Sequence, residues 1–178
     1  IQVPASDTTF SIVIDTLNDE VFEGDETFTL EGSTANQGTA TEGTATITDD
    51  GSNNGGDDRP EVQSISSPTV SEGSAATFDV ELTNASQSET TVSMTLANGT
   101  AEEGTDYSKT TVTVTYADQS TDTVPVDGDG KFSIQVPASD TTFSIVVDTL
   151  NDEVFEGDET FTLEGSTANQ GTPTEGTA

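Results

Sequence analysis

Thr149–Leu163 reads TLNDEVFEGDETFTL, and the identical sequence occurs once before, at Thr16–Leu30. The stretch mixes acidic and apolar residues: Asp152, Glu153, Glu156, Asp158 and Glu159 are interspersed with Val154, Phe155, Phe161 and Leu163. A solvated acidic tail would not carry this apolar content, and the Thr-rich, β-branched flanks favour strands over a helix. We therefore predict a tight acidic turn between two strands, with its phenylalanines anchored in a core.

Carboxylates crowded on such a turn repel one another. At a separation of about 4 Å and an effective dielectric constant near 20, each like-charged pair costs roughly 4 kcal/mol. A divalent cation bound by oxygen ligands relieves this repulsion most simply. Ca²⁺ fits better than Mg²⁺, because Mg²⁺ demands octahedral geometry and retains its water. The sequence therefore predicts Ca²⁺ as the cofactor.

The composition is strongly acidic: the 178 residues carry a formal net charge of −31, and the only cationic side chains are Arg59, Lys109 and Lys131. Nucleic acid and anionic membranes are excluded as partners, since binding to either needs clustered Lys and Arg. No stretch is long and apolar enough for membrane insertion. The chain has no Cys and no His, so disulfides and thiolate or imidazole metal sites are excluded. Such a composition is typical of a secreted bacterial protein, which predicts an extracellular location at the bacterial cell surface.

Catalysis is not expected from this sequence. Without His or Cys, the usual nucleophile and base pairs cannot form, and no Gly-rich phosphate loop leads from a strand into a helix. Paired carboxylates can cleave glycosidic bonds, but the chain has no Trp and only two Tyr to line a sugar cleft. We therefore predict that the protein is not an enzyme.

The chain contains a long internal repeat. Ile1–Ala45 recurs as Ile134–Ala178, with differences only at Ile14, which becomes Val147, and at Ala40, which becomes Pro173. Near-identical neighbouring copies indicate a tandem array. We predict that residues 1–50 are the C-terminal half of one repeat and that residues 51–59 are a linker rich in Gly, Asn and Asp. Residues 60–178 are then a second repeat that lacks its last strand.

Apolar residues alternate with polar ones in short runs throughout residues 60–178, and turn residues separate the runs. About seven such strands predict an all-β fold, an antiparallel immunoglobulin-like β-sandwich, in tandem. Asp127–Gly130 resembles the start of an EF-hand loop, but the twelfth position is Ala138, where a Glu is required. We interpret it as a hairpin turn. Residues 1–50 alone would expose an unpaired strand edge, so we expect strand complementation with another copy of the chain.

Four motifs in order resemble the Calx-β domain: VSEG at Val70–Gly73, GTDY at Gly104–Tyr107, NDEVFEGDETF at Asn151–Phe161 and TITDD at Thr46–Asp50. Tandem Calx-β-like repeats build the stalks of large secreted bacterial adhesins of the RTX type, and the near-identical copies resemble that setting. The resemblance implies a structural spacer that Ca²⁺ rigidifies.

The resemblance also implies that Ca²⁺ binds at one pole of the sandwich. It places side-chain ligands at Glu72, Asp106, Asp152, Glu156 and Glu159, a backbone carbonyl ligand at Val154, the equivalent first-copy ligands at Asp19, Val21 and Glu23, and terminal ligands at Asp49 and Asp50. Asn151 stands where metal-binding members often have Asp, so one charge is missing. The linker aspartates follow closely on Asp49 and Asp50, so a cation could also stiffen the linker.

The primary hypothesis is therefore a Ca²⁺-binding spacer repeat of a long extracellular bacterial adhesin. Its expected partners are calcium ions and the neighbouring repeats of the same chain. Two alternatives stay open: a Ca²⁺-dependent module that binds glycans or a host surface, and a regulatory Ca²⁺ sensor.

Overall fold

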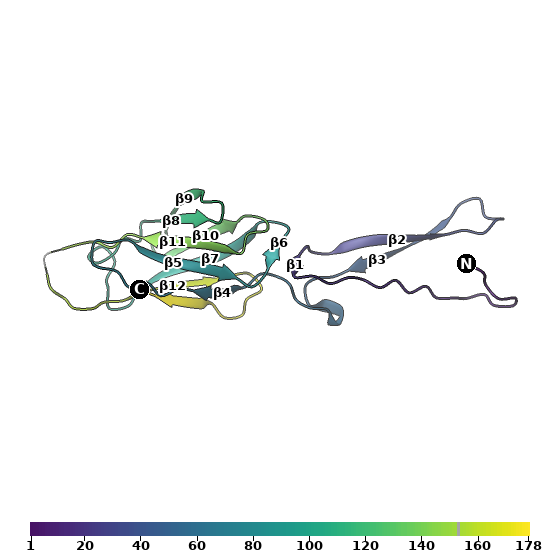
Figure 1. Ribbon diagram of the computed structural model, residues 1–178, viewed down its shortest axis with the longest axis horizontal. Coiled ribbons are helices and arrows are strands. Elements are labelled where there is room, and N and C mark those ends of the chain that lie inside the picture. Colours follow the sequence, from purple (N-terminus) through teal and green to yellow (C-terminus); the bar gives the residue numbers. More distant parts are fainter. Residues whose placement is uncertain (153) are drawn as a thin grey trace.

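The computed structural model describes residues 1–152 and 154–178, and it shows a β-sandwich that continues into a long N-terminal arm (Figure 1). Apart from one parallel pair, in which β1 (Val21–Phe22) lies beside β6 (Ala85–Ser86), the paired strands are antiparallel. The short 3₁₀ turn η1 spans Ser52–Asn54. Within the described part of the chain, no helix could cross a membrane. The predicted all-β antiparallel fold is confirmed, while Glu153 of the acidic turn lies outside the described residues.

Two sheets face each other in the sandwich. The four-stranded sheet has the order β10-β7-β12-β13, with β7 at Thr90–Asn98, β10 at Lys131–Val136, β12 at Phe161–Ser166 and β13 at Thr174–Thr177. The five-stranded sheet has the order β4-β5-β11-β8-β9, with β4 at Val62–Ile65, β5 at Ala76–Leu82, β8 at Thr111–Tyr116, β9 at Thr121–Pro125 and β11 at Thr142–Val147. Side chains on successive residues of a strand point to opposite faces, so the predicted alternation buries one face of each sheet.

The hydrophobic core lies entirely within residues 60–178. Phe78 of β5 and Tyr107 are fully buried, and Phe161 at the start of β12 is 4% exposed. The Tyr107 and Phe161 rings stack with their centroids 4.4 Å apart, and Phe78 meets Phe161 edge to face at 5.8 Å. These three rings form the floor beneath one end of the sandwich, next to the repeated acidic turn.

The Asp127–Gly130 segment closes the turn between β9 and β10. The Asp127 carboxylate accepts hydrogen bonds from the backbone N–H groups of Asp129 and Lys131, at 2.9 and 2.8 Å. The Gly130 N–H donates to the Asp127 carbonyl at 3.0 Å. The segment is therefore a tight turn, but the interpretation as a hairpin turn was wrong, because β9 pairs with β8 in one sheet and β10 pairs with β7 in the other.

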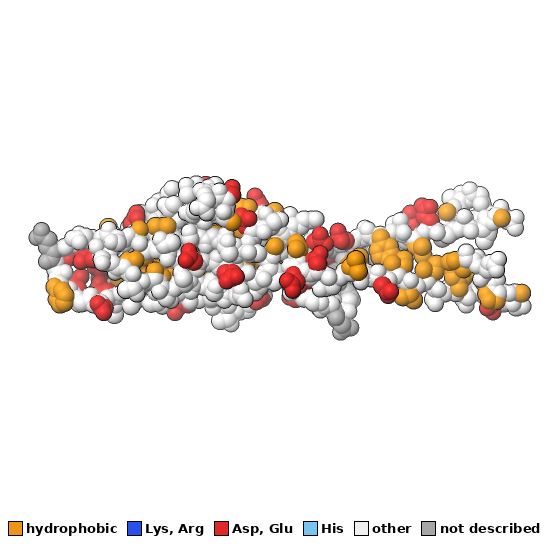
Figure 2. All heavy atoms as spheres, viewed as in Figure 1, with side chains coloured by type: hydrophobic (Ala, Val, Ile, Leu, Met, Phe, Trp, Pro, Cys, Tyr) orange, Lys and Arg blue, Asp and Glu red, His pale blue; other side chains and the backbone are white. Residues whose placement is uncertain are grey.

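The N-terminal copy of the repeat adopts a different structure from the C-terminal copy. Residues 134–147 contain the second half of β10 and all of β11, whereas the matching residues 1–14 form no strand. Phe143 is 4% exposed in β11, but its counterpart Phe10 is 59% exposed. Figure 2 shows hydrophobic side chains gathered along the N-terminal arm. Since the two sequences are nearly identical, the difference comes from the neighbouring strands that cover only the second copy.

Part of the first copy does pair with itself. β2 (Glu26–Gly32) and β3 (Thr41–Ile47) form an antiparallel hairpin in which Thr29 lies opposite Thr44. The same register recurs between β12 and β13, where Thr162 lies opposite Thr177. β13 therefore corresponds to the start of β3. The prediction that the second repeat lacks its last strand needs correction: the first residues of that strand are in place, because β12 supplies their hydrogen-bonding edge.

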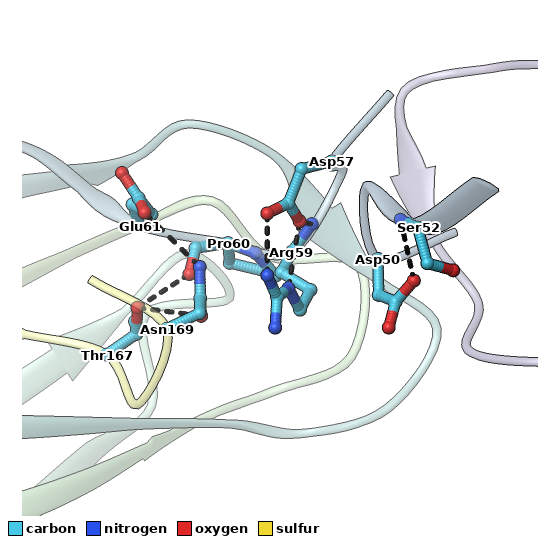
Figure 3. A network of polar contacts seen from close by, with 8 residues as sticks. All are labelled: Asp50, Ser52, Asp57, Arg59, Pro60, Glu61, Thr167 and Asn169. Carbon is cyan, nitrogen blue, oxygen red and sulfur yellow. Dashed lines mark hydrogen bonds and ion pairs between the residues drawn. The ribbon is translucent and has the colours of Figure 1, made fainter. Parts of the chain in front are cut away.

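The linker is folded against the start of the sandwich (Figure 3). Arg59 forms an ion pair with Asp57, with Nη2 and Oδ2 2.7 Å apart. The buried Thr167 hydroxyl donates to the Pro60 carbonyl at 2.7 Å. The Asn169 amide nitrogen lies 3.4 Å from the Glu61 carboxylate. The segment that leaves the linker is thereby fixed to the loop between β12 and β13.

Candidate metal centre

Three acidic side chains converge at the end of the sandwich that faces away from the arm. Asp106, Glu156 and Glu159 each place a carboxylate oxygen within 4.8 Å of the other two. Asp106 comes from the turn between β7 and β8, whereas Glu156 and Glu159 belong to the acidic turn between β11 and β12. The fold therefore brings together predicted ligands that are about fifty residues apart in the sequence.

The aromatic floor explains why these two turns meet. Tyr107 follows Asp106 directly and stacks on Phe161, which follows Glu159 by two positions. The Tyr107 hydroxyl donates to the Asn98 side-chain oxygen at 2.5 Å, so its polar end is satisfied. Asp106 itself accepts a hydrogen bond from the Glu102 N–H at 2.7 Å. The stacked rings thus set the distance between the two acidic segments.

Glu72 and Asp152 lie at the edge of the same cluster. One Glu72 carboxylate oxygen accepts a hydrogen bond from the Asp152 N–H at 2.8 Å. The Asp152 carboxylate in turn accepts from the Val154 N–H at 2.7 Å. Glu72 lines a hollow of about 610 Å³ that Asp106, Glu156 and Glu159 also line. This volume leaves room for water and further ligands beside an ion.

One expectation about this turn was wrong. Phe161 is anchored in the core, but Phe155 is 96% exposed and Val154 is 60% exposed. Their first-copy counterparts, Phe22 and Val21, are half-buried because they pair with β6. Phe155 therefore lacks an anchor because no strand of this chain lies beside it within the described residues.

Burial and the neighbouring negative charges raise the pKa values of two acids of this cluster, Glu156 and Glu159. Burial raises the pKa of Glu156, and the negative charges of Asp106, Asp152, Glu72 and Glu102 raise it further. Burial and the charge of Asp106 likewise raise the pKa of Glu159. The residues that line the hollow include no Lys or Arg. An all-oxygen, uncompensated donor set of this kind suits a hard cation such as Ca²⁺.

Without calcium, this cluster should make the protein less stable as the pH rises. Because the folded-state pKa values of Glu156 and Glu159 are raised, the folded state binds more protons than the unfolded state. The resulting stabilisation is fully present below the ordinary Glu pKa of about 4.3 and is lost as the pH rises through the raised values. Thermal unfolding in EDTA from about pH 4 to pH 7 measures the effect.

A variant combining Glu156→Gln with Glu159→Gln provides the control for the pH effect. Asp50, Asp57 and Asp118 have lowered pKa values and act in the opposite direction. The test is therefore the difference between wild type and variant, which should grow as the pH rises. Parallel melting-temperature profiles for the two proteins would contradict this interpretation.

A second acidic cluster, with Asp19, Glu23 and Asp49, lies where the arm joins the sandwich. Figure 2 shows acidic side chains gathered in this region. The Asp49 carboxylate accepts a hydrogen bond from the Glu23 N–H at 2.9 Å. The Asp19 carboxylate accepts from the Val21 N–H at 2.9 Å, as Asp152 does from Val154 in the other copy. The nearby charges of Glu26, Asp19 and Asp49, together with burial, raise the pKa of Glu23.

Asp50 is directed away from this second cluster. Its carboxylate accepts a hydrogen bond from the Ser52 N–H at 3.0 Å, as Figure 3 shows. Hydrogen bonds from Ser52 lower the pKa of Asp50, and the charge of Arg59 adds to the effect. The structure thus places Asp49 beside the first-copy acidic turn and directs Asp50 into the linker.

Asp58 is a candidate that the sequence analysis did not single out. Its Oδ2 atom is buried, and no donor among the described residues reaches it. Burial raises the pKa of Asp58, and the adjoining Asp49 carboxyl raises it further. The only signal in the sequence is the pair of aspartates at each end of the linker, Asp49–Asp50 and Asp57–Asp58. The structure thus leaves one Asp58 oxygen without a donor among the described residues, beside the negative charge of Asp49.

The comparisons with known proteins identify one family. The model of the Calx-beta domain matches residues 4–51, 56–136 and 124–177. No curated protein sequence matches the chain.

Two solved structures show weak likeness to the chain. One is of AvmM, described as catalysing macrocyclization in alchivemycin A biosynthesis, at 7% identity over 64% of this chain and 84% of that chain, with a TM-score of 0.32. The other is AggA, the major subunit of aggregative adherence fimbriae type I from Escherichia coli, at 14% identity over 67% of this chain and 87% of that chain, with a TM-score of 0.28. TM-scores this low carry no argument about fold or function.

Proposed function

The chain belongs to the Calx-beta domain family, a family of non-enzymatic, calcium-related β-sandwich modules, and from this premise we propose that it is a calcium-binding spacer repeat. The parent protein would be a long extracellular adhesin at the bacterial cell surface. The observation that carries the proposal is the convergence of Asp106, Glu156 and Glu159, whose oxygens lie within 4.8 Å of one another. Glu72, Asp152 and the Val154 carbonyl would complete the coordination.

The proposed mechanism is linkage between ion binding and order. An ion that binds only the folded, aligned state stabilises that state by mass action. At a net charge of −31, repulsion between neighbouring acidic turns favours separation and bending of the repeats. Calcium bound at the acidic ends of the sandwiches would neutralise this charge. The array of repeats would then change from flexible to rigid and extended. The carboxylates of Asp106, Glu156 and Glu159 would bind the ion. The packed rings of Phe78, Tyr107 and Phe161 would keep these carboxylates in position.

We further propose that strands from another repeat cover the N-terminal arm. Ile145 and Leu163 are fully buried in the sandwich, but their counterparts Ile12 and Leu30 are 42% and 43% exposed. The strands that cover the C-terminal copy come from residues 60–133. The equivalent strands of a second copy of the chain, or of a preceding repeat, would cover the arm in the same way.

Small-angle scattering of the chain with calcium and with EDTA tests both parts of the proposal. We expect a longer, stiffer particle with calcium and a more compact average shape after chelation. The forward scattering should also give a mass above that of a monomer as the concentration rises, because the arm pairs with a second copy. Identical profiles under both conditions would contradict the spacer mechanism, and a monomeric mass throughout would contradict complementation.

A further inference from the structure

The acidic turn of the first copy docks onto the second repeat through its apolar pair, Val21–Phe22. This pair is β1, and it lies parallel to β6, with Val21 opposite Ala85 and Phe22 opposite Ser86. The Gln87 N–H donates to the Phe22 carbonyl at 2.8 Å. Figure 1 shows the contact where the arm joins the sandwich. Two successive repeats therefore meet here through the main chain, and both side chains of the pair become half-buried.

The edge that receives this pair, residues 85–87, is held in place by the sandwich itself. Ser86 is 4% exposed, and its carbonyl accepts a hydrogen bond from the Ser139 N–H at 2.8 Å. The Ser86 hydroxyl accepts from the Ser88 N–H at 3.2 Å. Residues 83–88 carry no charged side chain, although the net charge of the chain is −31. An apolar pair flanked by acids thus meets no like charge on this edge.

The C-terminal copy presents the same turn without a partner. The Asp152 carboxylate accepts from the Val154 N–H at 2.7 Å, and the corresponding groups of the first copy lie 2.9 Å apart. Gly157 has a φ of 88°, and the corresponding glycine of the first copy has a φ of 77°. Yet Val154 is 60% exposed and Phe155 is 96% exposed. The free turn already has the local geometry of the docked one, so docking needs little reorganisation.

We propose that Val154–Phe155 docks onto the residue 85–87 edge of a following repeat, as Val21–Phe22 docks onto this one. The partner is a second copy of the same repeat, because β6 of this chain is already occupied by β1. The contact would fix the orientation of each repeat on the next through main-chain hydrogen bonds and one covered aromatic side chain. The inference rests on the proposed array of spacer repeats, but it does not require calcium.

The experiment uses two copies of the chain joined directly. Because Ala178 corresponds to Ala45, a fusion of residues 1–178 with residues 46–178 continues the repeat in the order found in this chain. The acidic turn of the first sandwich is then followed by a complete second sandwich, whose β6 no arm occupies. The fusion therefore contains the proposed pair of partners once.

A cysteine pair reports the contact, since the chain has no Cys of its own. Val154→Cys in the first sandwich and Ala85→Cys in the second take the positions that face each other between β1 and β6. Neighbouring strands lie about 4.8 Å apart, within the range of about 4.4–6.8 Å that a disulfide spans between Cα atoms. Val21→Cys with Ala85→Cys in the 178-residue chain gives the reference rate for this register.

The matched control moves the second cysteine to Ser120, an exposed residue in the turn between β8 and β9. This turn lies at the same end of the sandwich as β6, because Tyr116 at the end of β8 pairs with Phe143 near the start of β11. In EDTA and a glutathione buffer, we expect the pair at residue 85 to form its disulfide at least about tenfold faster than the pair with Ser120→Cys. Equal rates would show chance encounters of tethered domains and would overturn the inference.

Phe155→Ser in the fusion tests the aromatic contact and should slow the disulfide at least about tenfold. It should still fold, because Phe155 is 96% exposed. Phe22→Ser changes only the first junction, so it should leave the rate unchanged. A rate that does not depend on Phe155 would also overturn the inference. Calorimetric titration of the fusion with CaCl₂ tests the proposed function separately: calcium binding without the contact overturns the inference alone, and the contact without calcium binding overturns the calcium proposal alone.

Discussion

Removal of calcium is expected to lower the melting temperature of the sandwich by about 10 °C. A single ion present at about 100 times its dissociation constant stabilises the folded state by about 2.7 kcal/mol, and for a domain of this size that corresponds to a shift of this order. The physical reason is that Asp106, Glu156 and Glu159 repel one another in the folded state, whereas the unfolded chain separates them. Differential scanning calorimetry with CaCl₂ and then with EDTA measures the shift.

Two controls make the calcium result specific. Mg²⁺ at the same concentration should restore little of the melting temperature, because it retains its water and demands octahedral geometry. The variant that combines Glu156→Gln with Glu159→Gln should show a smaller difference in melting temperature between calcium and EDTA than wild type does. Equal stabilisation of wild type and variant by calcium would indicate general charge screening in place of a site, and would contradict the account.

Phe161→Ala is expected to destabilise the protein by about 3–5 kcal/mol, the usual cost of truncating a buried aromatic side chain. Phe161 is 4% exposed, stacks on Tyr107 and meets Phe78 edge to face. The substitution removes the floor that positions Asp106 against Glu159, so calcium affinity should fall as well. Urea unfolding measures the loss of stability, and calcium titration measures the loss of affinity.

Phe28→Ala is the matched control for Phe161→Ala, because the internal repeat places the same residue in the same local sequence. Phe28 lies in the β2–β3 hairpin, is only half-buried and is not part of the core. Its substitution should cost less than about 1 kcal/mol. Equal losses for the two variants would show that the arm is packed as tightly as the sandwich, which would contradict the structure described above.

The sequence predicted the strands of residues 60–178 well, because each strand has one buried face and its apolar residues alternate. It could not predict that residues 1–14 form no strand while residues 134–147 belong to β10 and β11. Identical local sequences have identical propensities, so the outcome depends on whether neighbouring strands supply hydrogen bonds and cover the apolar face. Phe155 illustrates the same limit: it is apolar and follows the pattern, yet it is 96% exposed.

The sequence predicted those residues of the candidate metal site that belong to recognisable motifs. Asp106 and the acidic turn belong to two such motifs, and the stacking of Tyr107 on Phe161 brings them together. Asp58 was not predictable, because its orientation depends on Asn84, twenty-six residues further along the chain. Asp50 was expected among the acids, but its nearest backbone donor, the Ser52 N–H, holds it in the linker.

The most direct test of calcium binding is crystallographic. Crystals grown with CaCl₂ should show an anomalous peak at the end of the sandwich, with oxygens of Asp106, Glu156 and Glu159 about 2.3–2.6 Å from it. A map without such a peak, in which these three side chains point apart into solvent, would contradict the central claim that calcium compensates the charge gathered there.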